Sequence, residues 1–125
     1  MEKKVHSFDF LIKGGPYSHI IEANGFLFVS GMLPIDTENG IMITDDVIKG
    51  TGLALTNVKR ALTAVGSGME KVVKATVYLR DMADFNAMND VYRTFFPFNP
   101  PARTCIAVRE IPGNSPVEVE VIALK

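Results

Sequence analysis

The sequence predicts an α+β fold in which two helices pack on one face of a mixed β-sheet. Apolar residues recur at spacings of three and four in two segments, 45–65 and 84–96, which is the period of an amphipathic helix. Segments before, between and after them alternate apolar and polar residues, as strands do. The resulting order, β-β-α-β-α-β-β, is typical of an α+β layout.

The first two strands are expected as a hairpin within residues 18–30. Two isoleucines, Ile20 and Ile21, precede Asn24-Gly25, and four apolar residues follow. Asn and Gly both accept the positive φ of a type I′ turn, so this pair between apolar runs indicates a tight hairpin. A second turn is expected at Glu38-Asn39-Gly40.

The first helix is expected over residues 45–65. Thr44 is the expected N-cap, and Asp45 and Asp46 suit the positive end of the helix dipole. Gly66-Ser67-Gly68 ends the helix. Its apolar face comprises Val47, Ala54, Leu55, Val58, Ala61, Leu62 and Val65.

A strand at 71–79 and a helix at about 84–96 follow, and Pro97 stops this helix. The strand is expected to turn Val73, Ala75, Val77 and Leu79 to one face. The helix carries the stripe Phe85, Met88, Val91, Tyr92 and Phe95. The uncovered face of the sheet is too apolar for water, so a homo-oligomer is expected to bury it.

The last two strands, near 103–109 and 117–124, carry polar residues on one face and β-branched residues on the other. If they pair as an antiparallel hairpin, Arg103 and Cys105 lie near Glu118 and Glu120. Pro100-Pro101 holds the entry to the first of these strands rigid. Beside a cysteine the guanidinium is expected to be partly buried, and a buried Arg needs a bidentate anion such as a carboxylate. A solvated or salt-bridged Arg103 is the alternative.

Composition excludes several classes of function. The 125 residues suit a single domain, 1–125, and 13 basic against 14 acidic residues, without clusters, argue against nucleic acid. A lone cysteine and the start Met1-Glu2-Lys3-Lys4 favour a cytoplasmic protein, and no apolar run is long enough for a membrane span. His6 and His19 have no ligands at metal-binding spacing, so neither a metal nor another cofactor is expected.

Several motifs in order along the chain resemble the reactive intermediate deaminase family, also called Rid or YjgF. The motifs are Gly15-Pro16-Tyr17-Ser18, Val29-Ser30-Gly31 with Pro34, Val73-Lys74-Ala75-Thr76-Val77 with Asp81-Met82, Met88-Asn89-Asp90-Val91-Tyr92 with Phe95-Phe96, Pro101-Ala102-Arg103-Thr104-Cys105, and Val117-Glu118-Val119-Glu120-Val121-Ile122-Ala123. The resemblance implies a chorismate-mutase-like subunit and a homotrimer with a cleft at each interface. The implied activity is that of a cofactor-free 2-iminobutanoate/2-iminopropanoate deaminase, which hydrolyses 2-enamine and 2-imino acids to 2-keto acids and ammonia.

Residue roles follow from the resemblance. It implies that Arg103 binds the substrate carboxylate and that Glu118 orients or activates water. Glu120 shares the strand face of Glu118 and is the competing base. The implied pocket lining comprises Tyr17, Ser30, Gly31, Asn89 and Cys105. Met32 and His19 depart from the glutamines that many members carry at these positions, while none of the implied catalytic residues is missing.

Two other functions remain open from the sequence. One is a non-catalytic trimer that binds small carboxylates as a metabolic regulator, for which the same Arg103 pocket would serve. The other is an RNA-cleaving translation inhibitor or chaperone-like protein, activities also attributed to the family. The balanced charge counts against RNA.

Overall fold

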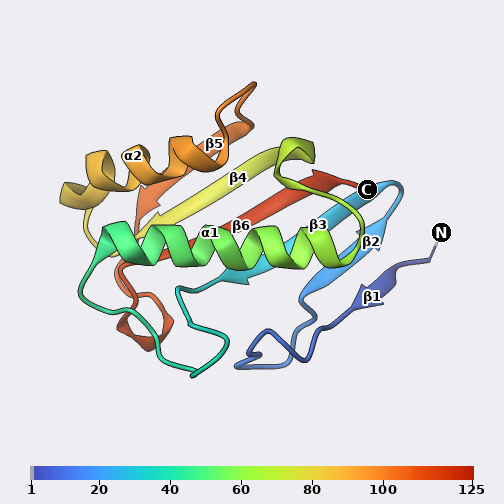
Figure 1. Cartoon of the computed structure of the whole chain (residues 1–125), viewed down its shortest axis with the longest axis horizontal. Coiled ribbons are helices and arrows are strands. Elements are labelled where there is room, and N and C mark those ends of the chain that lie inside the picture. Colours follow the sequence, from blue (N-terminus) through green and yellow to red (C-terminus); the bar gives the residue numbers. More distant parts are fainter. Residues whose placement is uncertain (1) are drawn as a thin grey trace.

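The computed structural model describes residues 2–125. Met1, the first residue of the segment Met1-Glu2-Lys3-Lys4 discussed above, therefore lies outside the described residues. The chain forms one six-stranded sheet and two α-helices (Figure 1). The strands are β1 (Lys4–His6), β2 (Ile20–Ala23), β3 (Phe26–Met32), β4 (Val72–Leu79), β5 (Ala102–Ala107) and β6 (Val117–Leu124). The helices are α1 (Val47–Ala64) and α2 (Phe85–Phe95), with 3-10 turns η1 (Met69–Lys71), η2 (Met82–Asp84) and η3 (Pro112–Asn114).

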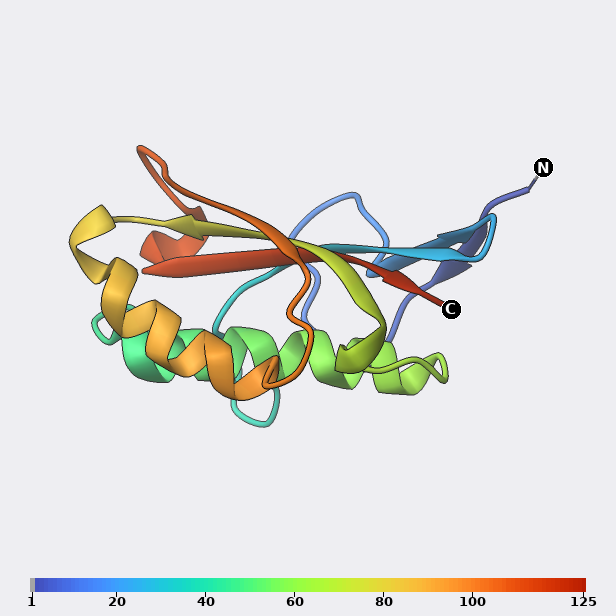
Figure 2. The same cartoon turned by 90° about the horizontal axis from the view of Figure 1, so that it is seen from above.

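The sheet order is β1-β2-β3-β6-β4-β5, and both helices cover the same face (Figure 2). Helix α2 connects β4 to its parallel neighbour β5, whereas α1 connects β3 to β4 across the central strand β6. Parallel strands need a crossover connection, and the common handedness of such crossovers sends both helices to one side. The predicted α+β class, with a mixed sheet and two helices on one face, is confirmed.

The expected pairing of the last two strands is wrong. Strand β5 pairs with β4 in parallel, while β6 lies antiparallel between β3 and β4. Both strands pair with β4, which lies between them, and they do not pair with each other. The turn between them, which contains η3, therefore crosses from the sheet edge to its centre instead of closing a hairpin.

Two local expectations need correction, and one strand was not anticipated. Asp46, not Thr44, caps α1, and its carboxylate accepts hydrogen bonds from the N–H groups of Ile48 and Lys49, both at 3.0 Å. A register shift between Val72 and Lys74 turns Val73 outward, so Val72 takes its place in the core. The N-terminal strand β1 was not anticipated, because its three residues are too short to show a period.

The core lies between the sheet and the helices. Alternate residues of β6 (Val117, Val119, Val121 and Ala123) are buried there together with the apolar face of α1. The opposite face of the sheet, called the open face below, carries exposed apolar side chains. These are Phe26 and Phe28 of β3, Val73 of β4, Ile106 of β5 and Leu124 of β6, each between 37% and 45% exposed. Among the described helices, none is long and apolar enough to cross a membrane.

Candidate active site

A β-bulge in β3 shapes the first part of the site. Strand β3 pairs regularly with β6 up to Val29 and resumes at Met32, so that Ser30 and Gly31 form an irregularity between them. The pairing of β2 with β3 also ends at Val29. On the side of β3 that faces β2, no strand therefore lies beside residues 30–32. Bulges re-aim side chains and are frequent beside active sites. This one opens a gap at the edge of β3.

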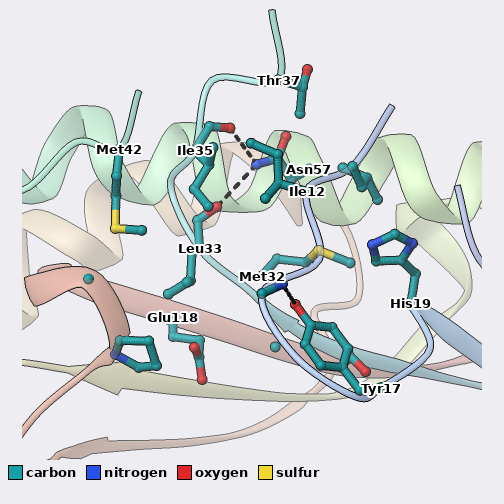
Figure 3. A pocket seen from close by; sticks show the side chains of 16 residues that line it. Ile12, Tyr17, His19, Met32, Leu33, Ile35, Thr37, Met42, Asn57 and Glu118 are labelled. Atoms are coloured by element: carbon teal, nitrogen blue, oxygen red, sulfur yellow. Dashed lines mark hydrogen bonds between the residues drawn. The ribbon is translucent and has the colours of Figure 1, made fainter. Parts of the chain in front are cut away.

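A cavity of about 530 Å³ occupies the gap. Tyr17, Ser30, Gly31 and Glu118 line it, as the resemblance implies for one pocket. Figure 3 shows Glu118 and Tyr17 on one side of this cavity and Asn57 of α1 on the other. The remaining lining residues are Leu11, Ile12, Gly14, His19, Met32, Leu33, Ile35, Thr37, Met42, Pro112 and Gly113.

The Glu118 carboxylate lies directly against the backbone of Gly31. A methyl group on Gly31 would stand 2.8 Å from Glu118 Oε1 and 2.9 Å from its carboxyl carbon. Only glycine leaves this space, since real Cβ atoms do not approach other atoms so closely. A side chain at position 31 would therefore push the Glu118 carboxylate away from its place beside the bulge.

The surroundings of Glu118 favour its protonated form. Burial raises the pKa of the Glu118 carboxyl, and the nearby negative charge of Glu120 raises it further. Glu120 itself accepts a hydrogen bond from the hydroxyl of Tyr78, an interaction that raises the pKa of Tyr78 to about 12. Of the two carboxylates, Glu118 faces the cavity while Glu120 is bound to a neighbouring side chain.

His19 forms part of the same wall. It is 2% exposed, and its Nδ1 accepts a hydrogen bond of 2.9 Å from the N–H of Phe8, so the ring proton resides on Nε2. Burial lowers the pKa of His19. Over residues 2–125 Nε2 has no hydrogen-bond partner. His19 is thus a neutral donor in the cavity wall.

Arg103 occupies a second, separate hollow of about 340 Å³ together with Asn89. Its Nη1 donates a hydrogen bond of 2.8 Å to Asn89 Oδ1, and its guanidinium lies 4.7 Å from the centre of the Tyr92 ring. Within the described part of the chain, no carboxylate forms a salt bridge with it. A partly buried cation fixed by an amide and a ring, with its charge uncompensated, is suited to bind an anion.

Cys105 follows Arg103 on the same face of β5 and lines neither cavity. Burial raises the pKa of its thiol, while the positive charge of Arg103 opposes the rise. The nucleophilic form of cysteine is the thiolate. A raised pKa therefore favours Cys105 as a packing residue over a nucleophile.

Arg103 and Glu118 of one chain point to opposite faces of the sheet. Residues paired across neighbouring strands point to the same face. Arg103 pairs with Ala75, and Ala75 pairs with Val121, so all three point toward the helices. Glu118 pairs with Tyr78 and points to the open face. The expected proximity of Arg103 and Glu118 within one chain is therefore wrong.

Some residues of the site were not singled out from the sequence. Phe85 and Tyr92 of α2 lie against Arg103 with their rings, and Asn89 stands between them on the same helical face. The spacing of four and three residues is the signal that could have grouped them. Asn57 had no such signal, because its partners, the carbonyls of Leu33 and Ile35, are distant in sequence.

The space beside Gly31 leads to a direct prediction. Gly31→Ala is expected to displace the Glu118 carboxylate and to lower activity at least about tenfold while the chain stays folded, because the displaced atoms end a flexible side chain. Turnover and circular dichroism of the variant measure both effects. Gly52→Ala is the matched control, since its added methyl meets nothing closer than 3.8 Å. Equal activity of both variants would contradict the positioning role of Gly31.

Comparisons with known proteins show which family the chain is similar to. The sequence model of the family described as Endoribonuclease L-PSP matches residues 11–125. A RutC family protein of Pyrococcus horikoshii is 42% identical over 111 residues, 89% of this chain and 88% of that protein. The 2-iminobutanoate/2-iminopropanoate deaminase of Capra hircus is 39% identical over 89% of this chain and 81% of its own. The crystal structure of E. coli TdcF with bound serine has a TM-score of 0.86 at 32% identity, covering 90% and 91% of the two chains.

The family match extends over nearly the whole chain, and the structural neighbours share its full architecture. The E. coli YjgF gene product, for example, has a TM-score of 0.90 at 29% identity and covers 98% of both chains. The resemblance noted from the sequence motifs is thereby confirmed. The chain belongs to the Endoribonuclease L-PSP family, the family of the RutC, YjgF and Rid proteins.

Proposed function

We propose that the protein is a cofactor-free deaminase that hydrolyses 2-imino and 2-enamine acids to 2-keto acids and ammonia. The observation that carries this proposal is the uncompensated guanidinium of Arg103, which Asn89 and Tyr92 hold in place. The deaminase name of the Capra hircus relative supports the reaction, and the serine bound to E. coli TdcF supports an amino-acid-like ligand.

In the proposed mechanism, Arg103 binds the substrate carboxylate through two parallel hydrogen bonds. Glu118 accepts a proton from a water molecule while the water oxygen forms a bond to the imine carbon C2. The electron pair of the C2=N bond passes to the nitrogen, and Glu118 returns the proton there, which gives a carbinolamine with a hydroxyl and an amino group on C2. Glu118 then transfers the hydroxyl proton to the nitrogen, the C2–N bond breaks, and ammonia leaves as the carbonyl of the 2-keto acid forms. The raised pKa of Glu118 suits both steps, because a group that titrates closer to neutral pH exchanges protons more readily.

The proposal requires a second copy of the chain. Arg103 and Glu118 point to opposite faces of one sheet, so a single chain offers only half of the site to a small substrate. We propose a homotrimer in which Arg103 of one subunit meets the Glu118 pocket of the next. The exposed apolar residues of the open face support an association through this face.

A substitution at Phe28 tests the proposed homotrimer. It is 45% exposed on the open face, and Phe28→Asp is expected to shift the particle from three times 13.7 kDa toward the monomer, because burying a carboxylate in an apolar interface is costly. Light scattering measures the mass, and activity should fall together with it. Ile48→Asp, at a 57% exposed position of α1, is the matched control and should keep the wild-type mass. A wild-type protein that is monomeric at assay concentration would contradict the shared site.

The activity is tested by generating an imine in situ. An amino-acid oxidase supplies 2-imino acids, and semicarbazide competes with the protein for them. The expected result is that wild-type protein lowers the yield of trapped imine and raises the yield of 2-keto acid. No acceleration by the folded protein, over imines from small, branched and aromatic amino acids, would refute the deaminase proposal.

The two alternative functions can be distinguished with the same protein preparation. A carboxylate-binding regulator, which the serine-bound neighbour favours, would bind 2-keto acids without accelerating imine loss. A ribonuclease, which the description of the family favours, would cleave RNA in a manner sensitive to changes at Glu118 or Arg103. The cytoplasmic location stays a prediction.

A further inference from the structure

Two loops form part of the cavity wall beside Glu118. Residues 8–17, called the flap below, precede β2 and contribute Ile12 to the lining. Residues 33–42, called the fixed loop below, follow β3 and contribute Thr37 (Figure 3). The two loops meet, because a methyl group on Gly40 would stand 3.7 Å from Ile12 Cδ1. The position of the flap relative to the fixed loop therefore sets the shape of the cavity.

The fixed loop is tied to the rest of the chain by hydrogen bonds. Asn57 Nδ2 of α1 donates to the carbonyls of Leu33 and Ile35 at 3.1 and 2.9 Å. Ile35 and Met42 form an isolated β-bridge, which closes the loop on itself. Opening of a segment tied in this way would break several hydrogen bonds at once. The fixed loop is therefore a firm support for the flap.

The flap lacks such ties. Within the part of the chain that the structure describes, every hydrogen bond of residues 8–17 stays inside residues 8–19. One of them runs from the N–H of Phe8 to His19 Nδ1 at 2.9 Å. Leu11 packs into the core, so apolar contacts hold the flap to the body of the protein. A segment with so few hydrogen bonds to its surroundings opens at low free-energy cost.

Arg60 of α1 connects the two loops. Its Nη1 donates a hydrogen bond to Thr37 Oγ1 of the fixed loop, and its guanidinium carbon lies 4.8 Å from the centre of the Phe10 ring of the flap. The Phe10 ring stacks on Phe8 at 5.1 Å, and Phe8 stacks on His19 at 5.8 Å. A stack of side chains therefore runs from Arg60 on α1 to His19 in the cavity wall.

The charge of Arg60 is not used elsewhere. Among residues 2–125 no carboxylate forms a salt bridge with it. Arg60 is exposed, yet it makes one specific contact with each loop. A cation over an aromatic face is attracted by the ring even at exposed sites. Because Arg60 belongs to α1, these contacts fix the flap to a rigid element.

We propose that Arg60 is a positioning residue for the imine hydrolysis, because it holds the flap closed and so keeps Tyr17 and His19 in the cavity wall. This inference rests on the proposed deaminase function. Without Arg60 the flap is open for part of the time, and a substrate that requires the closed form binds more weakly in proportion to the closed fraction. In the complex the flap is closed again, so the chemistry at Glu118 proceeds as before.

Arg60→Ala is therefore expected to raise KM for imines about fivefold while kcat stays within about twofold of wild type, since a cation–π contact and one hydrogen bond are lost. Lys59→Ala removes the same charge from the preceding, also exposed, residue of α1 and should leave both constants unchanged. Arg60→Lys keeps a cation near the ring and should recover part of the wild-type KM. An unchanged KM in Arg60→Ala, or a fall in kcat alone, would overturn the positioning role.

The stack predicts how two substitutions combine. Phe10→Leu keeps an apolar side chain but removes the ring that Arg60 contacts, so it should raise KM as Arg60→Ala does. In the double variant the increase should be clearly smaller than the product of the two single increases, because residues in contact do not act independently. Increases that multiply would contradict the action of Arg60 through Phe10.

Hydrogen exchange tests the closing of the flap without catalysis. The N–H of Phe8 donates to His19, whose carbonyl accepts a hydrogen bond of 3.0 Å from the N–H of Ser30, so opening the flap breaks the Phe8 bond. Arg60→Ala is expected to speed exchange of the Phe8 amide about fivefold and to leave exchange in α1 unchanged. Unchanged exchange of the Phe8 amide would overturn the inference. Faster exchange in a protein whose wild type accelerates no imine would refute the deaminase proposal and leave the role of Arg60 in closing the flap.

Discussion

Arg103→Ala is expected to lower kcat/KM for imine hydrolysis at least about a hundredfold. The substitution removes two charge-assisted hydrogen bonds to the substrate carboxylate, each of which contributes about 1.5–3 kcal/mol. Steady-state kinetics with an in situ imine source measures the loss. Arg103→Lys should recover only part of it, because lysine keeps the charge without the planar fork that binds a carboxylate bidentately.

The control for Arg103 is Arg109→Ala, which removes an exposed arginine just beyond the same strand. It changes the net charge equally and should leave kcat/KM near the wild-type value. Circular dichroism establishes that both variants are folded. Activity that survives in Arg103→Ala would refute its role as the carboxylate anchor, since the described residues offer no other cation in either cavity except the exposed Arg93.

Glu118→Gln is expected to reduce kcat by about a hundredfold or more, because glutamine keeps the shape of the side chain but cannot accept a proton from water. Substrate binding through Arg103 should change much less. Glu110→Gln, at an exposed position of the preceding turn, is the matched control. A variant with wild-type kcat would show that another group, with Glu120 the first candidate, handles the proton.

The pH dependence separates Glu118 from Glu120. Because burial and Glu120 raise the pKa of Glu118, activity should decline on acidification at a pH above 4.5, the ordinary value of the carboxyl. Glu120→Gln removes the neighbouring negative charge and should move this decline to lower pH. A decline that does not move would indicate that Glu118 is not the titrating group.

The same raised pKa affects stability. The folded chain binds the Glu118 proton more tightly than the unfolded chain does, so this contribution favours folding at low pH and is lost as pH rises through the folded pKa. At pH 7 the unfolded chain has released this proton, so the raised pKa of folded Glu118 opposes folding, and Glu118→Gln should raise Tm. The increase should shrink on acidification as Glu118 becomes protonated. Thermal unfolding of both proteins at pH 7 and pH 4 measures this difference.

Local patterns predicted most elements of this fold. The period of α1 and the Asn24-Gly25 turn depend on neighbouring residues only, and both lie close to where they were expected: Asn24 and Gly25 have positive φ angles, 53° and 80°. The cap of α1 was misassigned by two residues, from Thr44 to Asp46, because both residue types cap helices well. Such errors stay local and do not change the layer arrangement.

Strand partners depend on tertiary structure, and the error in the pairing of β5 shows why. The alternation of residues 103–109 is compatible with either neighbour, and it does not reveal which face meets the helices. The crossover through α2 makes β5 a parallel neighbour of β4 and turns Arg103 toward Tyr92. Period-2 patterns define two faces of a strand, whereas packing decides which of them is covered.

The amino-acid sequence was sufficient to predict the helices, most of the strands, the resemblance to the family and the residue types of the proposed chemistry. These depend on periodicity and on motifs that are contiguous in the chain. Tertiary structure alone decided that Gly31 makes room for Glu118, that an apolar cavity adjoins it, and that Arg103 faces the other side of the sheet. Such relations join residues far apart in sequence, and they arise from the bulge in β3 and the crossover connections, which no local pattern encodes.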